Sequence, residues 1–431
     1  MAFRTAVLLT AAIAAGGVSS RLFGADRPAP AASRSDFQAQ FPKSEASAAA
    51  IELERLAANL GIDLVPSGLL SAPKEDKDRP HPSAEAAAAS QAMTGGMNEY
   101  LDRELKSSGD RIGSAPDVLD RYVTDHTAEL TAIESLLLRE SEVRWETDLK
   151  AGQDGPRPNY LGLMRLQRLL IARSLIEARR EDVESAERLL EASWRLNDAL
   201  ASRPELISQI ILLAAAKFQV GALRKIDSPA YGWSERLRGG TLYAGYLAAF
   251  QNEFWFGSRD RDVQDMDGPG GAYARTLRRF VEELQQRDIC SLPPEKLREV
   301  WDRAIREEFP DEDRRAIANM AMPNLLESLA RWRRYLVDAE LTALVLDARA
   351  ERDSARRRAW PDKLLRLGQG VCPGARWSYR AFPNGTATFA FEAKIAEDDT
   401  SALRLPLTFS TGAPASHAPK ASKGKSAATK K

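Results

Sequence analysis

The chain contains very few of the side chains that most often bind metal ions or act in nucleophilic catalysis. Its 431 residues include two cysteines, Cys290 and Cys372, and three histidines, His81, His126 and His417. A structural zinc site needs more cysteine and histidine than these scattered positions supply. A catalytic triad would have to use His126, and the polar residues around it favour a solvated histidine instead. We therefore predict no metal site and no cofactor.

The sequence also has no net charge and none of the common catalytic motifs. Lysine plus arginine number 61, aspartate plus glutamate number 61, and the formal net charge is zero. A balanced chain produces no overall field that would attract nucleic acid, so we predict no nucleic-acid partner. The P-loop, the dinucleotide-binding glycine fingerprint, HExxH and GxSxG are all absent. These absences favour a non-catalytic protein but leave the question of an enzyme open.

The first 25 residues have the order of an export signal. Arg4 precedes an apolar run from Ala6 to Val18, and small residues follow it. The run is shorter than the roughly 20 residues of a membrane-spanning helix. Cleavage after Ser20 or Ala25 matches the small-residue rule only weakly, so an uncleaved N-terminal membrane anchor is the alternative. We predict an exported, periplasmic or envelope-associated protein that contacts the membrane only if this segment is retained.

Apolar residues recur every three to four positions through the middle of the chain, a pattern typical of packed amphipathic helices. Residues 204–224 are apolar on nearly all sides and predict a central helix. Ser208 and Lys217 interrupt this run, which argues against a membrane span. Ser202 and Glu205 match a capping box at its start. The predicted helices cover residues 44–60, 115–139, 160–178, 183–200, 204–224, 241–256, 271–288, 293–308 and 323–358.

The far end of the last predicted helix, residues 347–358 (DARAERDSARRR), is charged on all sides and predicts a segment that leaves the core. After it the period changes to two. Alternating residues flank Asn384–Gly385, a strong hairpin signal. A third strand is predicted at 402–409, at a sheet edge because Pro406 cannot donate to a ladder. The fold class is therefore mainly α, a multi-helix bundle or α-hairpin array with a small C-terminal antiparallel β-hairpin or three-stranded module.

Composition divides the chain into five predicted parts. The ends are rich in small and polar residues, and the helical pattern lies between them. The parts are a signal peptide or anchor (1–25), a flexible Pro/Ala-rich segment with a short helix (26–97), an α-helical domain (98–360), a small β module (361–411) and a disordered Lys-rich tail (412–431).

Two segments resemble known kinds of protein. Residues 160–178 and 183–200 look like one tetratricopeptide-type α-hairpin, with Ala172 and Ala186 at matching small positions, although one pair makes no array. The long helix, the WPDKL segment at 360–364 and a Tyr-containing strand before a hairpin are similar to uncharacterised exported helical proteins of bacteria. This resemblance implies export and architecture, and it implies no activity.

Residues 250–273 are the candidate binding segment. Four aspartates before Gly268 could hold Ca²⁺, but their spacing does not match an EF-hand, and a solvated acidic loop is the alternative. The aromatic residues before them could line a sugar or peptide groove, or belong to the core. Cys290 and Cys372 could form a disulfide in an oxidising compartment or remain separate buried thiols. The candidate binding residues are Phe254, Trp255, Phe256, Asp260, Asp262, Asp265 and Asp267.

The sequence thus predicts a non-catalytic exported scaffold or binding protein of the bacterial envelope, with a protein or an envelope polymer as its partner. One alternative is a carboxylate-dependent hydrolase or lyase acting on an envelope polymer, with Glu253, Asp260, Asp265 and Asp267 as candidate acids and bases. A second alternative is a membrane-tethered assembly factor. Glu134 and the Gly162-Leu163-Met164 segment resemble fragments of lytic transglycosylases, but the loop that joins these fragments in that family is absent here.

Overall fold

A computed structural model describes residues 39–66, 79–139, 143–228, 230, 232–239, 241–257, 269–286, 294–309, 312, 322–355, 359–364, 367, 376–392 and 403–412. In this part the chain is mainly helical, with one small antiparallel sheet near the C-terminus. The predicted fold class is therefore confirmed.

The helices follow one another along the chain, and three strands come after them. In order they are α2 (Ala48–Asn59), α3 (Ala84–Lys106), α4 (Asp117–Asp125), α5 (Thr127–Leu138), the 3₁₀ helix η2 (Leu149–Asp154), α6 (Tyr160–Arg179), α7 (Val183–Ala201), α8 (Leu206–Lys225), α9 (Trp233–Arg238), α10 (Thr241–Gly257), α12 (Pro269–Gln286), α13 (Pro294–Glu308), α15 (Met322–Ser354), β1 (Trp377–Ala381), β2 (Ala387–Phe391) and β3 (Thr408–Thr411).

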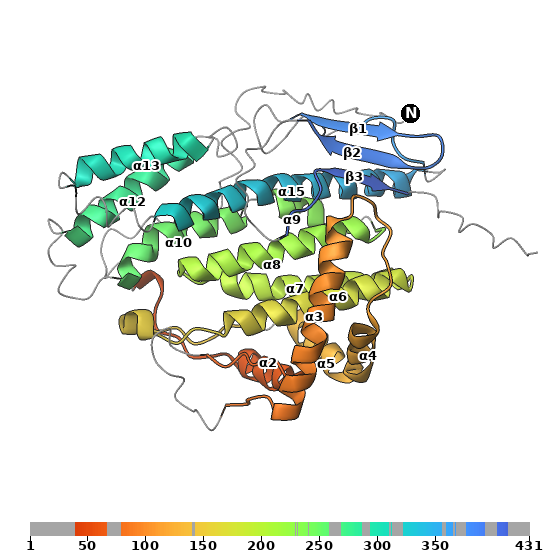
Figure 1. Ribbon diagram of the computed structural model, residues 1–431, viewed down its shortest axis with the longest axis horizontal. Coiled ribbons are helices and arrows are strands. Elements are labelled where there is room, and N and C mark those ends of the chain that lie inside the picture. Colours follow the sequence, from red (N-terminus) through yellow and green to blue (C-terminus); the bar gives the residue numbers. More distant parts are fainter. Residues whose placement is uncertain are drawn as a thin grey trace, which may run out of the picture.

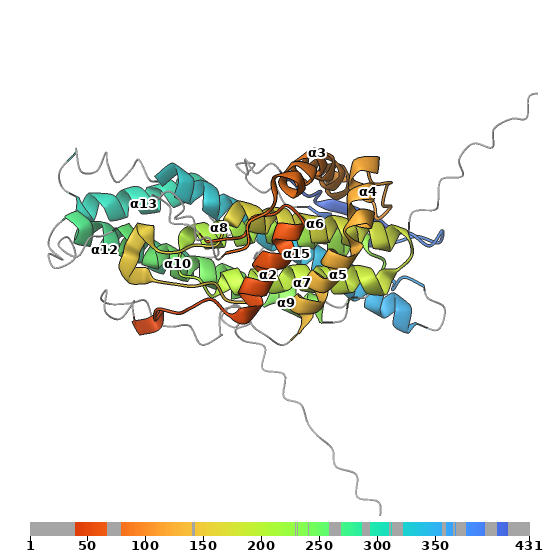
Figure 2. The same cartoon turned by 90° about the horizontal axis from the view of Figure 1, so that it is seen from below.

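Helix α8 lies at the centre of the helical layers. It contacts α6, α7, α10 and α15, and the long α15 separates it from the sheet (Figure 1). Seen from below, α12 and α13 form a pair at one end of an elongated molecule (Figure 2). Among the described helices, α8 is the one long and apolar enough to cross a membrane, with a mean hydropathy of 1.7. Because 72% of that window is buried inside the protein, α8 has the surroundings of a core helix.

Polar residues on α8 are paired inside the core. Gln219 donates from Nε2 to Ser193 Oγ at 2.8 Å and accepts from Asn197 of α7. Asn197 in turn accepts from Gln167 Nε2 of α6 at 2.7 Å. Buried polar groups are tolerated when they are hydrogen-bonded, so this chain of amides fixes three helices against each other.

The predicted capping box at α8 is wrong. Ser202 ends α7, and Glu205 occupies the N-cap position of α8 without a side-chain cap bond. The Glu205 carboxylate accepts instead from Arg203 Nη2 at 2.6 Å, and both side chains are buried. A buried guanidinium needs a carboxylate partner more than the helix end needs a cap, because an unpaired buried charge is costly.

The segment predicted as one helix at 115–139 is two helices with His126 at the junction. Helix α4 packs on α3, whereas α5 packs on α2 and α7. The break gives each apolar stripe its own partner. The phenol of Tyr122 donates to the Leu60 carbonyl at 2.5 Å, which ties the end of α4 to the chain after α2.

The sheet has the strand order β1-β2-β3, antiparallel throughout. Phe389 on β2 pairs with Tyr379 on β1 and with Phe409 on β3, and this face covers α15 through Leu341 and Leu344. The turn after β1 ends at Gly385, which has φ +80°, and Gly385 N donates to Phe382 O at 3.1 Å. The predicted Asn-Gly hairpin is therefore confirmed.

The third strand is shorter and later than the predicted 402–409. Leu403 and Leu405 lie in irregular chain and join the helical core, and the strand starts at Thr408. Pro406 has no N–H, and its carbonyl accepts from Arg224 Nη1 at 2.9 Å, so the chain is held by a helix before it joins the sheet. Strand β3 is an edge strand, as predicted, and Ser410 N donates to Ser108 O at 2.7 Å.

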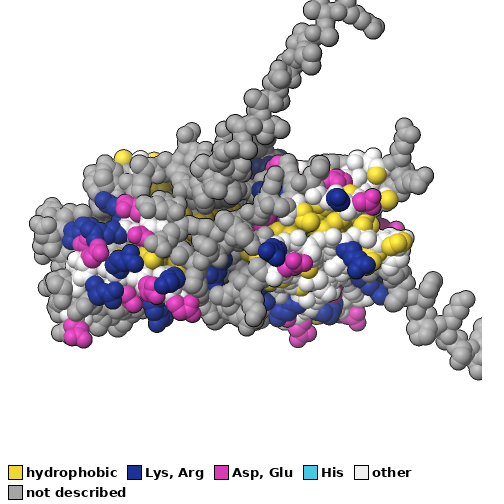
Figure 3. Space-filling model, turned by 90° about the horizontal axis from the view of Figure 1, so that it is seen from above, with side chains coloured by type: hydrophobic (Ala, Val, Ile, Leu, Met, Phe, Trp, Pro, Cys, Tyr) yellow, Lys and Arg dark blue, Asp and Glu magenta, His cyan; other side chains and the backbone are white. Residues whose placement is uncertain are grey.

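The expectation that the far end of the last helix leaves the core is wrong for residues 347–353, which are buried or partly buried. Arg349 is fully buried and lies between α8 and β3. A charged sequence at a helix end resembles a solvated one, but here the charges are neutralised by partners from other elements. Figure 3 shows the described surface from above, with positive and negative side chains interspersed and a hydrophobic area on the half that carries the sheet in Figure 1.

Candidate functional site

Most of the candidate site residues taken from the sequence lie outside the described residues. These are Asp260, Asp262, Asp265, Asp267, Cys290 and Cys372. For Glu253, Phe254, Trp255 and Phe256 the structure describes the backbone, which belongs to α10, and not the side chains. The predictions about these residues stay predictions.

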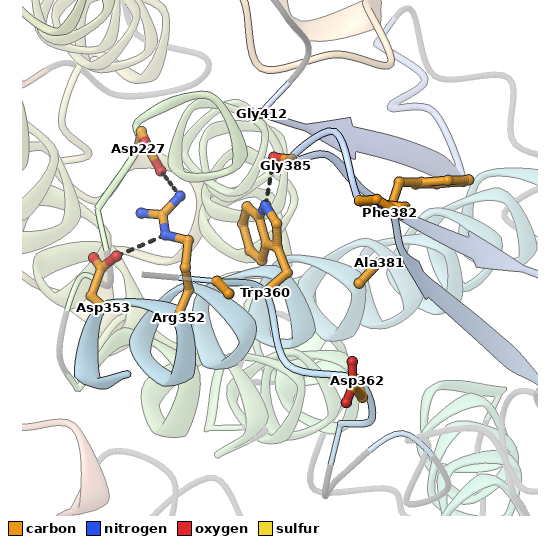
Figure 4. A pocket seen from close by; sticks show the side chains of 11 residues that line it. Asp227, Arg352, Asp353, Trp360, Asp362, Ala381, Phe382, Gly385 and Gly412 are labelled. Atoms are coloured by element: carbon orange, nitrogen blue, oxygen red, sulfur yellow. Dashed lines mark hydrogen bonds and ion pairs between the residues drawn. The ribbon is translucent and has the colours of Figure 1, made fainter. Parts of the chain in front are cut away.

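A groove is present where the end of α15 meets the sheet (Figure 4). Its volume is about 770 Å³, within the range of small-molecule binding sites. Four structural pieces form its walls: the chain after α8, the end of α15 with the segment that follows it, the β1–β2 turn, and the end of β3. The lining residues are Asp227, Arg352, Asp353, Ala359, Trp360, Asp362, Ala381, Phe382, Pro383, Gly385 and Gly412.

Arg352 is the central charged residue of the groove. Its Nη1 donates to Asp227 Oδ1 at 2.9 Å, and its Nε donates to Asp353 Oδ1 at 2.7 Å. Burial disfavours the charged guanidinium, but the two carboxylates outweigh burial and raise the pKa of Arg352. Figure 4 shows Arg352 between the two aspartates, one on each side. The three side chains form a fixed row of acid, base and acid.

Trp360 separates this charged row from the hairpin. Its indole Nε1 donates to the Gly385 carbonyl at 2.9 Å, and the Arg352 guanidinium lies 4.7 Å from the ring centroid, a cation–π contact. The phenol of Tyr379 donates to the Pro361 carbonyl at 2.7 Å. These bonds attach the segment after α15 to β1 and to the β1–β2 turn, and they hold the wall of the groove in place.

Arg349 is a buried arginine that lies beneath the row and contacts it through Asp227. Its guanidinium donates to the carbonyls of Leu223, Arg224 and Ile226, the last backbone acceptors of α8. A cation at a helix C-terminus satisfies these carbonyls and opposes the helix dipole. Its Nε also lies 3.4 Å from Asp227 Oδ1, so Arg349 and Arg352 hold the same carboxylate. Burial lowers the pKa of Arg349 to about 10.

The fourth wall is fixed by a loop far away in sequence. Asp110 Oδ2 accepts from the Gly412 amide at 2.6 Å and from the Thr411 hydroxyl at 2.5 Å. Gly412 has φ +72°, and a Cβ there would lie 2.5 Å from the Gly385 carbonyl oxygen. The end of β3 and the hairpin turn therefore approach each other as closely as a glycine permits.

The carboxylates of the row are engaged in ion pairs. Asp227 and Asp353 both accept hydrogen bonds from Arg352. Among the described residues, no group of three or more histidine, cysteine, aspartate or glutamate side chains could hold a metal ion. Elsewhere, Glu134 is buried and bound by Arg188 Nε at 2.9 Å, which gives it a structural partner.

Sequence reasoning missed this groove. Asp227 and Arg352 are separated by 125 positions and neither belongs to a motif. The available signals were indirect: an aromatic residue directly after a long helix, at Trp360, and a hairpin turn at Asn384–Gly385. Nothing in a single sequence shows that the two meet.

No family model, curated protein or solved structure matches this chain. The groove is therefore interpreted from its own residues.

Proposed function

We propose that the protein is an exported, non-catalytic binding protein of the bacterial envelope that holds its partner in the groove between α15 and the hairpin. Export rests on the N-terminal segment, where Arg4 precedes a short apolar run. Binding rests on the groove, whose volume of about 770 Å³ and mixed lining suit a ligand.

The observation that carries the proposal is that every wall of the groove is held by long-range contacts. Arg352 joins α15 to Asp227 after α8, Trp360 joins the helix end to the hairpin, and Asp110 joins the end of β3 to the loop after α3. A site that is organised before its ligand arrives loses less conformational entropy on binding. The C-terminal sheet then serves as one wall of a binding site attached to a helical support.

Export and groove binding are tested together. The full-length protein is produced with a C-terminal tag in a Gram-negative host, the cells are fractionated, and the purified protein is sedimented with isolated envelope. We expect the protein in the periplasmic or envelope fraction and in the envelope pellet. The double variant Asp227→Asn/Asp353→Asn should weaken the affinity for the envelope about a hundredfold or more, since each lost charge-assisted hydrogen bond costs about 1.5–3 kcal/mol.

The matched control is Asp102→Asn, an exposed aspartate of α3 whose partner is Lys106 at 2.6 Å. It removes the same charge far from the groove and should sediment like the native protein. A cytoplasmic protein would contradict export. Equal sedimentation of the native protein and the groove variant would contradict the assigned site.

A further inference from the structure

We propose that the groove recognises a neutral polyhydroxylated ligand, a saccharide unit of an envelope polymer. This inference rests on the proposed function and names the chemical class of the partner. Three features of the groove carry it: the pairing of its charges, the hydrogen-bonding atoms left over, and its apolar wall.

The charges of the row are already compensated. Asp227 lies within 3.4 Å of Arg349 and 2.9 Å of Arg352, and Asp353 accepts from Arg352. An anionic ligand would meet the two carboxylates beside the guanidinium, and a cationic ligand would have to compete with Arg352 for them. Breaking a partly buried ion pair costs more than an exposed one returns, so a neutral ligand is favoured.

The unused atoms of the row alternate between acceptor and donor. Within the described structure, the hydrogen bonds of the row use Arg352 Nη1 and Nε and the Oδ1 atoms of the two aspartates, and they leave Arg352 Nη2 and the two Oδ2 atoms to bond a ligand. A hydroxyl group both donates and accepts, so neighbouring hydroxyls on a sugar ring can donate to a carboxylate and accept from the guanidinium. Hydrogen bonds to charged groups are the stronger ones, and the row is held in one geometry before binding.

Much of the remaining lining is apolar. It consists of Ala359 and Trp360 from the segment after α15 and of Ala381, Phe382 and Pro383 from the hairpin. Figure 4 shows Trp360 in the middle of the groove, with Phe382 and Ala381 beyond it and Asp362 at the lower edge. A sugar ring has an apolar C–H face and a hydroxyl-bearing edge, which match this division of the groove between an apolar wall and a polar row.

The test is calorimetric titration of the full chain with three soluble probes: the tetrasaccharides of β-1,4-linked N-acetylglucosamine, β-1,4-linked glucose and α-1,4-linked glucose. We expect one of them to bind, with an affinity that changes less than about twofold between low salt and about 0.5 M salt, because the ligand is neutral. Asp227→Asn and Asp353→Asn should each weaken it about tenfold, and Asp102→Asn should not.

Four outcomes overturn the inference. The first is the absence of heat with all three probes at millimolar concentration, and the second is binding that the groove variants leave unchanged. The third is binding that high salt abolishes. The fourth is sedimentation with the envelope that depends on the groove but is lost when the envelope is treated with protease. The last result indicates a protein partner, so it rejects the saccharide and leaves the proposed function standing. If the protein is not exported, or if the groove variants sediment with the envelope as the native protein does, the proposed function itself is rejected.

Discussion

The guanidinium of Arg349 donates from Nη2 to the backbone carbonyl of Arg224 at 2.7 Å. This bond joins the middle of α15's charged end to the last turn of the central helix α8. Because the same side chain also lies 3.4 Å from Asp227, the groove and the core share one buried cation. The stability of the fold and the shape of the groove therefore depend on each other at this residue.

Replacing Arg349 with methionine should destabilise the protein by about 3 kcal/mol, because the carbonyls of Leu223, Arg224 and Ile226 lose their donor inside the protein. A hydrophobic residue can replace a buried ion pair when both partners are exchanged. Here the partners are backbone carbonyls, which cannot be exchanged. Urea unfolding at neutral pH measures the change.

The matched control is Arg55→Met in α2. Arg55 donates to Glu52 at 2.6 Å, but both side chains are about half exposed, so the loss should stay within about 0.5 kcal/mol. Equal effects of the two substitutions would contradict the assigned role of Arg349.

The stability of the protein should rise with pH above about 8 through Lys225. Its side chain is buried and donates to the Gly109 carbonyl, and burial lowers its pKa to about 8 against the opposing charges of Glu104 and Asp110. Below pH 8 the lysine is protonated in both folded and unfolded chains, and the burial penalty is fully present. Between about 8 and 10.5 the unfolded chain binds more protons, so the penalty is relieved as pH rises.

The difference in unfolding free energy between the native protein and Lys225→Met isolates this effect. It should move in favour of the native protein by on the order of 2 kcal/mol between about pH 7.5 and pH 10. A difference that stays constant over this range would show that Lys225 has the same proton affinity in both states.

Two helical glycines should respond to alanine with opposite signs. A Cβ on Gly162 of α6 would lie 1.9 Å from the Asp63 carbonyl oxygen, a backbone atom that cannot move without the chain. Gly162→Ala should therefore cost about 2 kcal/mol or more. Gly95 of α3 is exposed and has no heavy atom within 4 Å of that position, so Gly95→Ala should stabilise by about 0.5–1 kcal/mol.

Urea midpoints of the two variants give the signs directly. Two stabilising substitutions would mean that α6 does not approach residue 63 this closely. The close approach also explains a short sequence that by itself resembles a transglycosylase fragment: Gly162 is present because the backbone of another segment needs its space.

The sequence predicted most of the helices because an apolar stripe is a local property, but it missed α3, which begins in a segment assigned as flexible. Its errors fall where burial by other elements decides which groups must pair. Glu205 pairs with Arg203 instead of forming a capping box, and Arg349, which lies in a segment that appears solvated, is buried by α8 and β3. The groove was missed for the same reason, since it exists only after α8, α15 and the sheet are assembled.

Trp360→Phe should cost about 1 kcal/mol in stability, because phenylalanine keeps the aromatic surface and loses the indole donor to the Gly385 carbonyl. It should also weaken ligand binding, since the hairpin wall is no longer fixed to the end of α15. Urea unfolding and calorimetry on the same preparation check both effects. A variant with native stability and native affinity would contradict the role of Trp360 in fixing the hairpin wall.

The central claim, that the groove is the binding site, is tested most directly by hydrogen exchange. The full chain is labelled with and without soluble glycan fragments released from isolated envelope, and protection is mapped by mass spectrometry. The account predicts slower exchange at the hairpin turn around Phe382–Thr386 and at Gly412, with α12 and α13 unchanged. Unchanged exchange at the turn under saturating fragments, or protection confined to α12 and α13, would contradict it.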